Sequence, residues 1–111
     1  MISSHVLDTA LGCPASALTV HLDVLEANEQ WRRVTSVHTN ADGRASDLAD
    51  ANSLVERTCR LTFETGAYFA ATSRATCFPR VEVIFVLAAG AARYHIPLLL
   101  SPFSYTAYRG S

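Results

Sequence analysis

The chain has no lysine: in its 111 residues, all nine basic residues are arginine, against ten acidic residues. This absence excludes Schiff-base chemistry on lysine and any lysine general base. A cation used at a site must therefore be a guanidinium, which stays protonated and offers a planar fork of N–H donors. The net charge is −1 and the arginines are scattered, so the sequence lacks the basic stripe that nucleic-acid binding requires.

Cysteines and long apolar runs are also few. Cys13, Cys59 and Cys77 are odd in number and form no Cys-x-x-Cys pair, which indicates reduced thiols. The start, MISSHVLD, has neither the basic region nor the apolar region of a signal peptide, and no run approaches the roughly 20 apolar residues of a membrane span. We therefore expect a cytoplasmic protein with no membrane partner, folded as a single domain over residues 1–111.

Short alternating segments separated by turn residues fill the rest of the chain. Along Leu18–Leu25, for example, leucine and valine occupy every second position. The same pattern predicts strands at Ser3–Leu7, Leu18–Leu25, Gln30–Thr39, Thr58–Glu64, Val81–Leu87, Arg93–Leu100 and Phe103–Ser111. Gly66–Thr72 is the one convincing helix, and Ser46–Ser53 is predicted to be a loop with a helical turn at most. About eight short strands with one short helix predict an all-β, two-sheet β-sandwich.

Pro97 interrupts one of the predicted strands. Because proline cannot donate to a ladder, its position predicts an edge strand or a non-bonding side of the strand. Apolar edge strands must be covered, and pairing with a second copy is one way to cover them, so we expect an oligomer.

The residues able to move protons near neutral pH include four histidines. His5 and His95 fall in predicted strands, where a histidine is most often a hydrogen-bonded structural residue. Arg44 follows the Asp-Gly turn, where an arginine is usually solvated. A zinc site would need three histidines to converge, and no His-x-His or His-Glu-x-x-His spacing indicates one. No activating partner marks a cysteine nucleophile. Taken singly, none of these residues identifies a function.

Taken together, the chain resembles the 5-hydroxyisourate hydrolases of the transthyretin-related family along essentially its whole length. The resemblance rests on Ser4-His5-Val6-Leu7-Asp8-Thr9, Thr39-Asn40-Ala41-Asp42-Gly43-Arg44, Phe63-Glu64-Thr65-Gly66-Ala67-Tyr68-Phe69 and the ending from Tyr94 to Ser111. The final Tyr-Arg-Gly-Ser is the most specific element, since transthyretin itself does not keep it. The chain departs from the family at Arg93, where His-Tyr-His is common, and at Ala107.

The resemblance implies a transthyretin-like sandwich assembled as a homotetramer, with active sites in the channel where dimers meet. It implies His5, Arg44, His95 and Ser111 as catalytic residues, and His5, Arg44 and Tyr108 as substrate-binding residues, with no metal and no organic cofactor. The implied reaction is hydrolysis of 5-hydroxyisourate to 2-oxo-4-hydroxy-4-carboxy-5-ureidoimidazoline. The alternative is a non-catalytic carrier that binds a flat small molecule in the same channel, because one fold hosts many functions.

Overall fold

A computed structural model of the protein describes residues 1–110, and within this range it contains nine strands, one α-helix and one 3-10 helix. The elements in chain order are β1 (Ile2–Asp8), β2 (Cys13–Pro14), β3 (Thr19–Leu25), β4 (Trp31–His38), β5 (Arg44–Ala49), η1 (Ala51–Leu54), β6 (Thr58–Phe63), α1 (Thr65–Ala71), β7 (Val81–Val86), β8 (Tyr94–Ser101) and β9 (Ser104–Ala107). No helix in the described part of the chain is long and apolar enough to cross a membrane.

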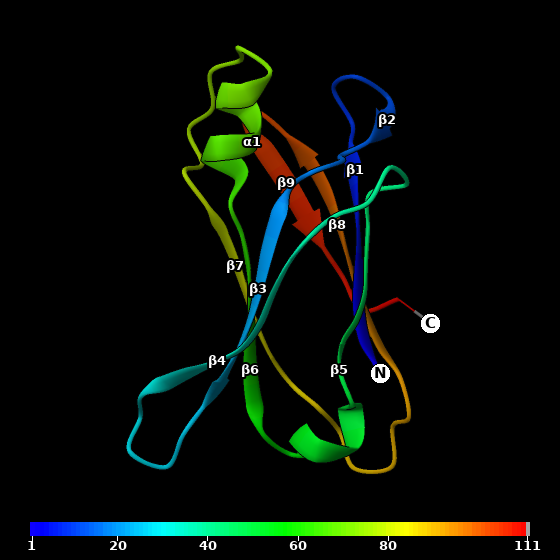
Figure 1. The fold of residues 1–111 in the computed structure, drawn as a ribbon, viewed down its shortest axis with the longest axis vertical. Coiled ribbons are helices and arrows are strands. Elements are labelled where there is room, and N and C mark those ends of the chain that lie inside the picture. Colours follow the sequence, from blue (N-terminus) through cyan, green and yellow to red (C-terminus); the bar gives the residue numbers. More distant parts are fainter. Residues whose placement is uncertain (111) are drawn as a thin grey trace.

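The strands form two sheets packed face to face (Figure 1). The first sheet has the order β2-β1-β8-β9, with β5 also paired to β1, and the second has the order β4-β3-β6-β7. Strands β1 and β8 run parallel, and every other pair in the described chain is antiparallel. The chain crosses between the sheets after β4, so that β5 lies beside β1 (Figure 1).

The core lies between the inner faces of the two sheets. Every second residue points inward, and the largest of these side chains are almost fully buried, including Ile2, Val6, Val20, Leu22, Leu61, Phe63, Leu98 and Leu100. Burying a side chain of this size stabilises the fold by roughly 1.5–3 kcal/mol. The alternation read from the sequence at Leu18–Leu25 therefore gives the correct inner face, and the prediction of a two-sheet β-sandwich with one short helix is confirmed.

The predicted loop over Ser46–Ser53 is wrong at its start, because Arg44–Ala49 forms strand β5, whereas the predicted helical turn is present as η1 (Ala51–Leu54). Strand β5 is irregular: Asp47 has φ +53°, and the register against β1 shifts between Ile2 and Ser4. Ser46 and Asp47 are consequently both exposed between buried Ala45 and Leu48. A bulge of this kind breaks the period-2 pattern by which strands are recognised in a sequence.

An edge position for Pro97 is also wrong. Strand β8 is internal, between β1 and β9, and Pro97 lies opposite His5. The structure agrees with the second prediction, a non-bonding side of the strand. Strand β9 ends at Ala107, which pairs with Leu98, so the regular ladder stops one residue before Pro97. The Pro97 carbonyl still accepts a hydrogen bond from the Tyr108 N–H (3.4 Å). The proline therefore removes no bond from a regular ladder.

Candidate active site

The outer face of the first sheet brings the candidate residues together from distant parts of the chain. Strand pairing places His5 opposite Arg44 on one side and opposite Pro97 on the other. One step along the sheet, the parallel register of β1 and β8 places Ser3 opposite His95. Because alternate residues of a strand share a face, these side chains lie on the face turned away from the core.

The turn before β5 fixes the position of Arg44. The Asn40 side-chain oxygen accepts hydrogen bonds from the backbone N–H groups of Asp42 (2.9 Å) and Arg44 (3.0 Å). Gly43 has φ +76°, and a Cβ there would lie 2.4 Å from the Val6 carbonyl oxygen. Only glycine satisfies both conditions, so the Asn-x-Asp-Gly turn holds the start of β5 against β1 beside His5.

A hollow of about 270 Å³ opens on this face beside Arg44 and His95. Its lining is polar apart from Met1 and combines two guanidiniums, one imidazole and three hydroxyls: Met1, Ser3, Ser4, Arg44, Ser46, Arg93 and His95. None of these lining residues is acidic, although the chain carries ten acidic residues. The hollow is therefore suited to a small molecule that accepts hydrogen bonds or carries negative charge.

His95 is half-buried and is oriented by a neighbour on β1. Its Nδ1 atom is hydrogen-bonded to the Ser3 hydroxyl (2.9 Å). Burial lowers the pKa of His95 from its usual value, and the positive charge of Arg44 and the nearby His5 lower the pKa further. At neutral pH His95 is therefore mainly the uncharged imidazole, which is the form able to accept a proton.

His5 lies next to the hollow rather than in its lining. Its Nε2 lies 2.8 Å from the Asp42 carbonyl oxygen. Because a carbonyl can only accept, Nε2 carries the proton in this bond, and Nδ1 of the neutral ring is left as an acceptor. The same Asx turn that positions Arg44 thus also holds His5.

The carboxyl-terminal segment runs beside His95. The Gly110 N–H donates to the His95 carbonyl oxygen (2.6 Å), and the Arg109 guanidinium stacks on the buried Tyr94 ring at 4.2 Å from its centroid. Tyr108 is 50% exposed and next to Pro97, outside the hollow's lining. Ser111, which the sequence analysis predicts to be catalytic, lies outside the described residues.

Sequence reasoning assigned no role to two residues that border the site, Ser3 and Gly110, and named a third, Arg93, only as a departure from the family. Ser3 orients His95, Gly110 packs against the His95 ring, and Arg93 lines the hollow. Strand alternation offered a signal for two of them, because Ser3 is two residues before His5 and Arg93 is two residues before His95. The zinc alternative has no ligand cluster: within residues 1–110 no group of three or more His, Cys, Asp or Glu side chains could hold a metal ion.

The strand order and the outer-face site define a transthyretin-like β-sandwich. The structure superposes on crystalline sea bream transthyretin, solved in complex with thyroxine, with a TM-score of 0.93 and 26% identity over 98% of this chain and 93% of that one. Among curated proteins, mouse 5-hydroxyisourate hydrolase is 41% identical, over 99% of this chain and 94% of its own length. The 5-hydroxyisourate hydrolase 2 of Rhizobium meliloti is 39% identical, over 99% and 95%.

The family model described as HIUase/Transthyretin family matches residues 2–110. The chain belongs to this family, and the family predicted from its sequence blocks is confirmed. The prediction of a hydrolase agrees with the names of the curated relatives.

Proposed function

We propose that the protein hydrolyses 5-hydroxyisourate to 2-oxo-4-hydroxy-4-carboxy-5-ureidoimidazoline. The observation that supports this most directly is the presence of Arg44 and an uncharged His95 in one small polar hollow. Relatives that carry this activity in their names align with almost the whole chain. The volume of about 270 Å³ lies near the lower end of the roughly 300–1,000 Å³ typical of ligand pockets, which suits a compact heterocycle.

In this proposal Arg44 binds the carbonyl of the ring's amide-type bond. Its guanidinium has no carboxylate within 4.0 Å among the described residues, so its N–H donors are available. Attack by water converts that carbonyl oxygen into an oxyanion, and a fixed cation stabilises the charge as it forms. The contribution of Arg44 is therefore larger in the transition state than in the bound substrate.

His95 acts as the general base. It removes a proton from water as the water oxygen bonds to the carbonyl carbon, and the Ser3 hydroxyl holds the ring in place at Nδ1. The carbon–nitrogen bond then breaks, and the proton taken by His95 passes to the departing ring nitrogen. The water oxygen remains in the new carboxylic acid, which releases its proton to solvent and becomes the carboxylate, so atoms and charge balance. Assistance of this kind contributes about 10²–10⁴-fold in rate.

His5, Tyr108 and the chain terminus complete the proposed site. His5 presents Nδ1 as an acceptor for an N–H on the rim of the substrate, while its Nε2–H remains bound to the Asp42 carbonyl. Tyr108 lies on the same face beside Pro97, where it covers the substrate from the side of β9. Ser111 follows Gly110, which is bound to His95, and we propose that it contributes a polar group to the same substrate.

We further propose that the molecule is a homotetramer of this single domain, acting in the cytoplasm. Large exposed apolar side chains at two places support assembly: Ile84 and Val86 on edge strand β7, and Leu11 and Phe103 in loops of the first sheet. Second copies would cover these positions and close the outer face above the hollow. The three cysteines are free, which agrees with a reducing compartment.

The test is to generate 5-hydroxyisourate with urate oxidase and to follow its ultraviolet decay with and without the protein. We expect decay far faster than the spontaneous reaction, saturable in substrate and proportional to protein concentration. A rate equal to that of the buffer control would contradict the proposal. It would favour the carrier, which sea bream transthyretin with bound thyroxine exemplifies on the same fold. Against the carrier, the lining of the hollow is cationic and hydroxylated rather than apolar.

A further inference from the structure

The arginines of this protein are used in two different ways. Five of the nine lie within 4.0 Å of a carboxylate: Arg32, Arg33, Arg57, Arg60 and Arg74. Arg109 stacks on Tyr94. Within residues 1–110, Arg44, Arg80 and Arg93 have neither kind of partner, and two of these three, Arg44 and Arg93, line the same hollow.

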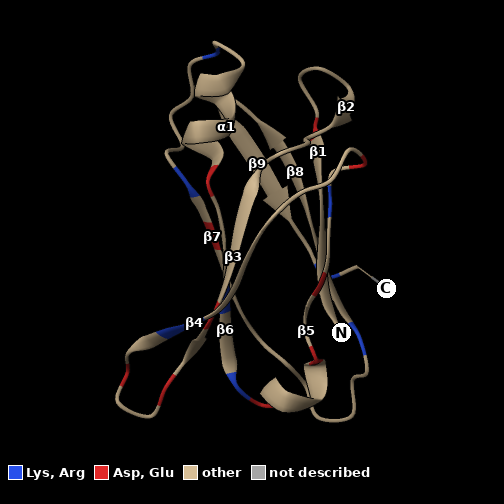
Figure 2. Ribbon diagram, in the orientation of Figure 1, with Lys and Arg blue, Asp and Glu red and all other residues tan. Residues whose placement is uncertain are grey.

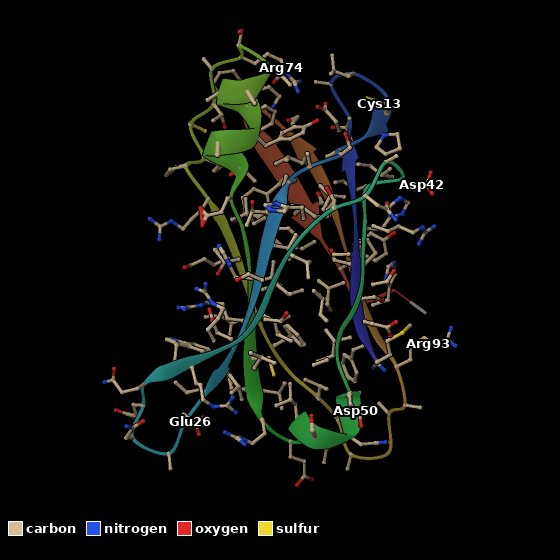
Figure 3. The ribbon with its side chains drawn as sticks, viewed as in Figure 1. Cys13, Glu26, Asp42, Asp50, Arg74 and Arg93 are labelled. Atoms are coloured by element: carbon tan, nitrogen blue, oxygen red, sulfur yellow. The ribbon has the colours of Figure 1, made fainter. Side chains whose placement is uncertain are left out.

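The two guanidiniums approach the hollow from different ends. Arg44 begins β5 opposite His5, whereas Arg93 directly precedes β8, two residues before His95 on the same face. Figure 2 marks positive positions at the start of β5 and just before β8, and Figure 3 shows the Arg93 side chain projecting outward from this sheet. Along the strand direction, Arg44 lies level with Pro97, two residues beyond His95, whereas Arg93 lies two residues before His95. A group that reacts at His95 therefore has a guanidinium on either side.

No acidic side chain in the lining neutralises this pair. The nearest acidic residue along β5, Asp47, does not line the hollow, and neither Arg44 nor Arg93 is within 4.0 Å of a carboxylate among the described residues. The lowered pKa of His95, to which Arg44 contributes, agrees with a positive potential here. Two cations in one hollow with no carboxylate partner within residues 1–110, in a protein with net charge −1, favour the binding of an anion there.

We propose that Arg93 and Arg44 form a carboxylate subsite, with Arg93 as a binding residue for the carboxylate that ring opening creates. This inference rests on the proposed function. The amide-type carbon of the substrate is uncharged before the reaction and becomes a carboxylate after water adds and the carbon–nitrogen bond breaks. A planar guanidinium matches that group with two parallel N–H donors. Arg44 holds the developing oxyanion, and Arg93 takes part of the charge as the carboxylate forms at the open side.

The test compares two flat heterocycles that differ by a carboxylate, orotate and uracil. Their binding to the wild-type protein is measured by isothermal titration calorimetry at low and high ionic strength, and their inhibition of 5-hydroxyisourate hydrolysis is measured in parallel. We expect orotate to bind more tightly than uracil at low ionic strength and to lose most of that advantage in salt. The expected loss of orotate affinity in Arg93→Gln is about 3- to 10-fold, because a half-solvated ion pair is worth little more.

Arg93→Lys keeps the charge without the planar fork, and we expect it to recover part of the orotate affinity. The matched control is Arg80→Gln, which removes an exposed arginine outside the hollow and is expected to change neither ligand. In turnover, Arg93→Gln is expected to weaken inhibition by orotate and to flatten the dependence of that inhibition on salt, with kcat reduced less than Arg44→Ala reduces it.

The two proposals fail differently. Absence of turnover in the wild-type protein contradicts the proposed function. Normal turnover combined with equal orotate affinity in wild type and Arg93→Gln overturns the carboxylate subsite alone. An equal loss of uracil binding in Arg93→Gln also overturns it, because the arginine would then shape the hollow rather than bind the carboxylate.

Discussion

At the scale of single residues, the proposed chemistry depends on the orientation of the His95 ring. Its Nδ1 is engaged by the Ser3 hydroxyl, its ring packs against Gly110, and its backbone accepts from the Gly110 N–H. These three contacts come from the two ends of the chain. They fix one orientation of the ring, which a general base requires before its pKa becomes relevant.

Replacing His95 with Asn is expected to lower kcat by about 100-fold or more while the fold is kept, because Asn can bond Ser3 but cannot take a proton at neutral pH. In the wild-type protein, kcat/KM should fall on the acid side with a midpoint below about 6.5, since a lowered pKa keeps the imidazole neutral to lower pH. Steady-state kinetics across pH, with circular dichroism for folding, measures both. His38→Asn, on the second sheet, is the control and should retain activity; full activity in His95→Asn would remove the base from the mechanism.

Gly110→Ala should impair turnover more than stability. A Cβ at this position would lie 2.8 Å from His95 Cδ2, so either the imidazole or the terminal segment must move. Misplacing a catalytic group by about 1 Å can cost 100-fold in rate. We expect a thermal midpoint close to wild type, because the segment lies at the end of the chain, together with a clear loss in kcat. Unchanged kcat would mean that the terminal segment does not determine the position of the His95 ring.

At the scale of secondary-structure elements, a buried ion pair ties β1 to the segment around α1. Asp8, at the end of β1, is fully buried and accepts hydrogen bonds from the Tyr68 hydroxyl (2.8 Å), the Arg74 guanidinium (2.6 Å) and the Leu11 N–H (3.0 Å). Burial alone would raise the pKa of Asp8, but these hydrogen bonds and the charge of Arg74 outweigh it, so the pKa is lowered. The same strand carries His5, so this pair anchors the site from the far end of β1.

Asp8→Asn should destabilise the protein by roughly 3 kcal/mol at neutral pH, because it leaves Arg74 partly buried without its carboxylate. A folded-state pKa below the unfolded value stabilises the protein above that value and loses its effect as the pH falls through the folded pKa. The difference between wild type and variant should therefore shrink below about pH 4. Urea unfolding at several pH values measures it, with the exposed Glu29→Gln as control; a difference independent of pH would contradict an ionic origin.

At the scale of the whole molecule, the exposed apolar edge of strand β7 supports the proposed assembly. Ile84 on β7 is 60% exposed, at the edge of the second sheet, and Val86 on the same face is 56% exposed. Ile84→Asp is expected to reduce the molecular mass of the particle in light scattering after gel filtration, since a charge there opposes pairing of a second copy at this edge. Glu82→Gln, on the same face of β7, is the matched control. An unchanged mass in Ile84→Asp would exclude β7 from the interface.

Much of this organisation could be predicted from the sequence. Alternation at Leu18–Leu25 and Val81–Leu87 identified strands because each has one face in the core, and Gly66–Thr72 identified the helix to within a residue. Strand β5 escaped because its bulge at Asp47 removes the alternation. Pro97 was left between an edge strand and a non-bonding side of its strand, because the sequence does not reveal that β9 ends before it. In both cases the missing information is the register of a partner strand.

The sequence by itself determined the sandwich, the family and the identity of His5, Arg44 and His95 as candidates, because periodicity and short motifs are local properties of the chain. Only the tertiary structure decided which residues share a cavity. It brought Ser3 to His95 through a parallel pairing of the first and eighth strands, left His5 and Tyr108 beside the hollow, and added Arg93 to its lining. The physical reason is that strand order and register, which place distant residues side by side, depend on packing of the whole core rather than on any single segment.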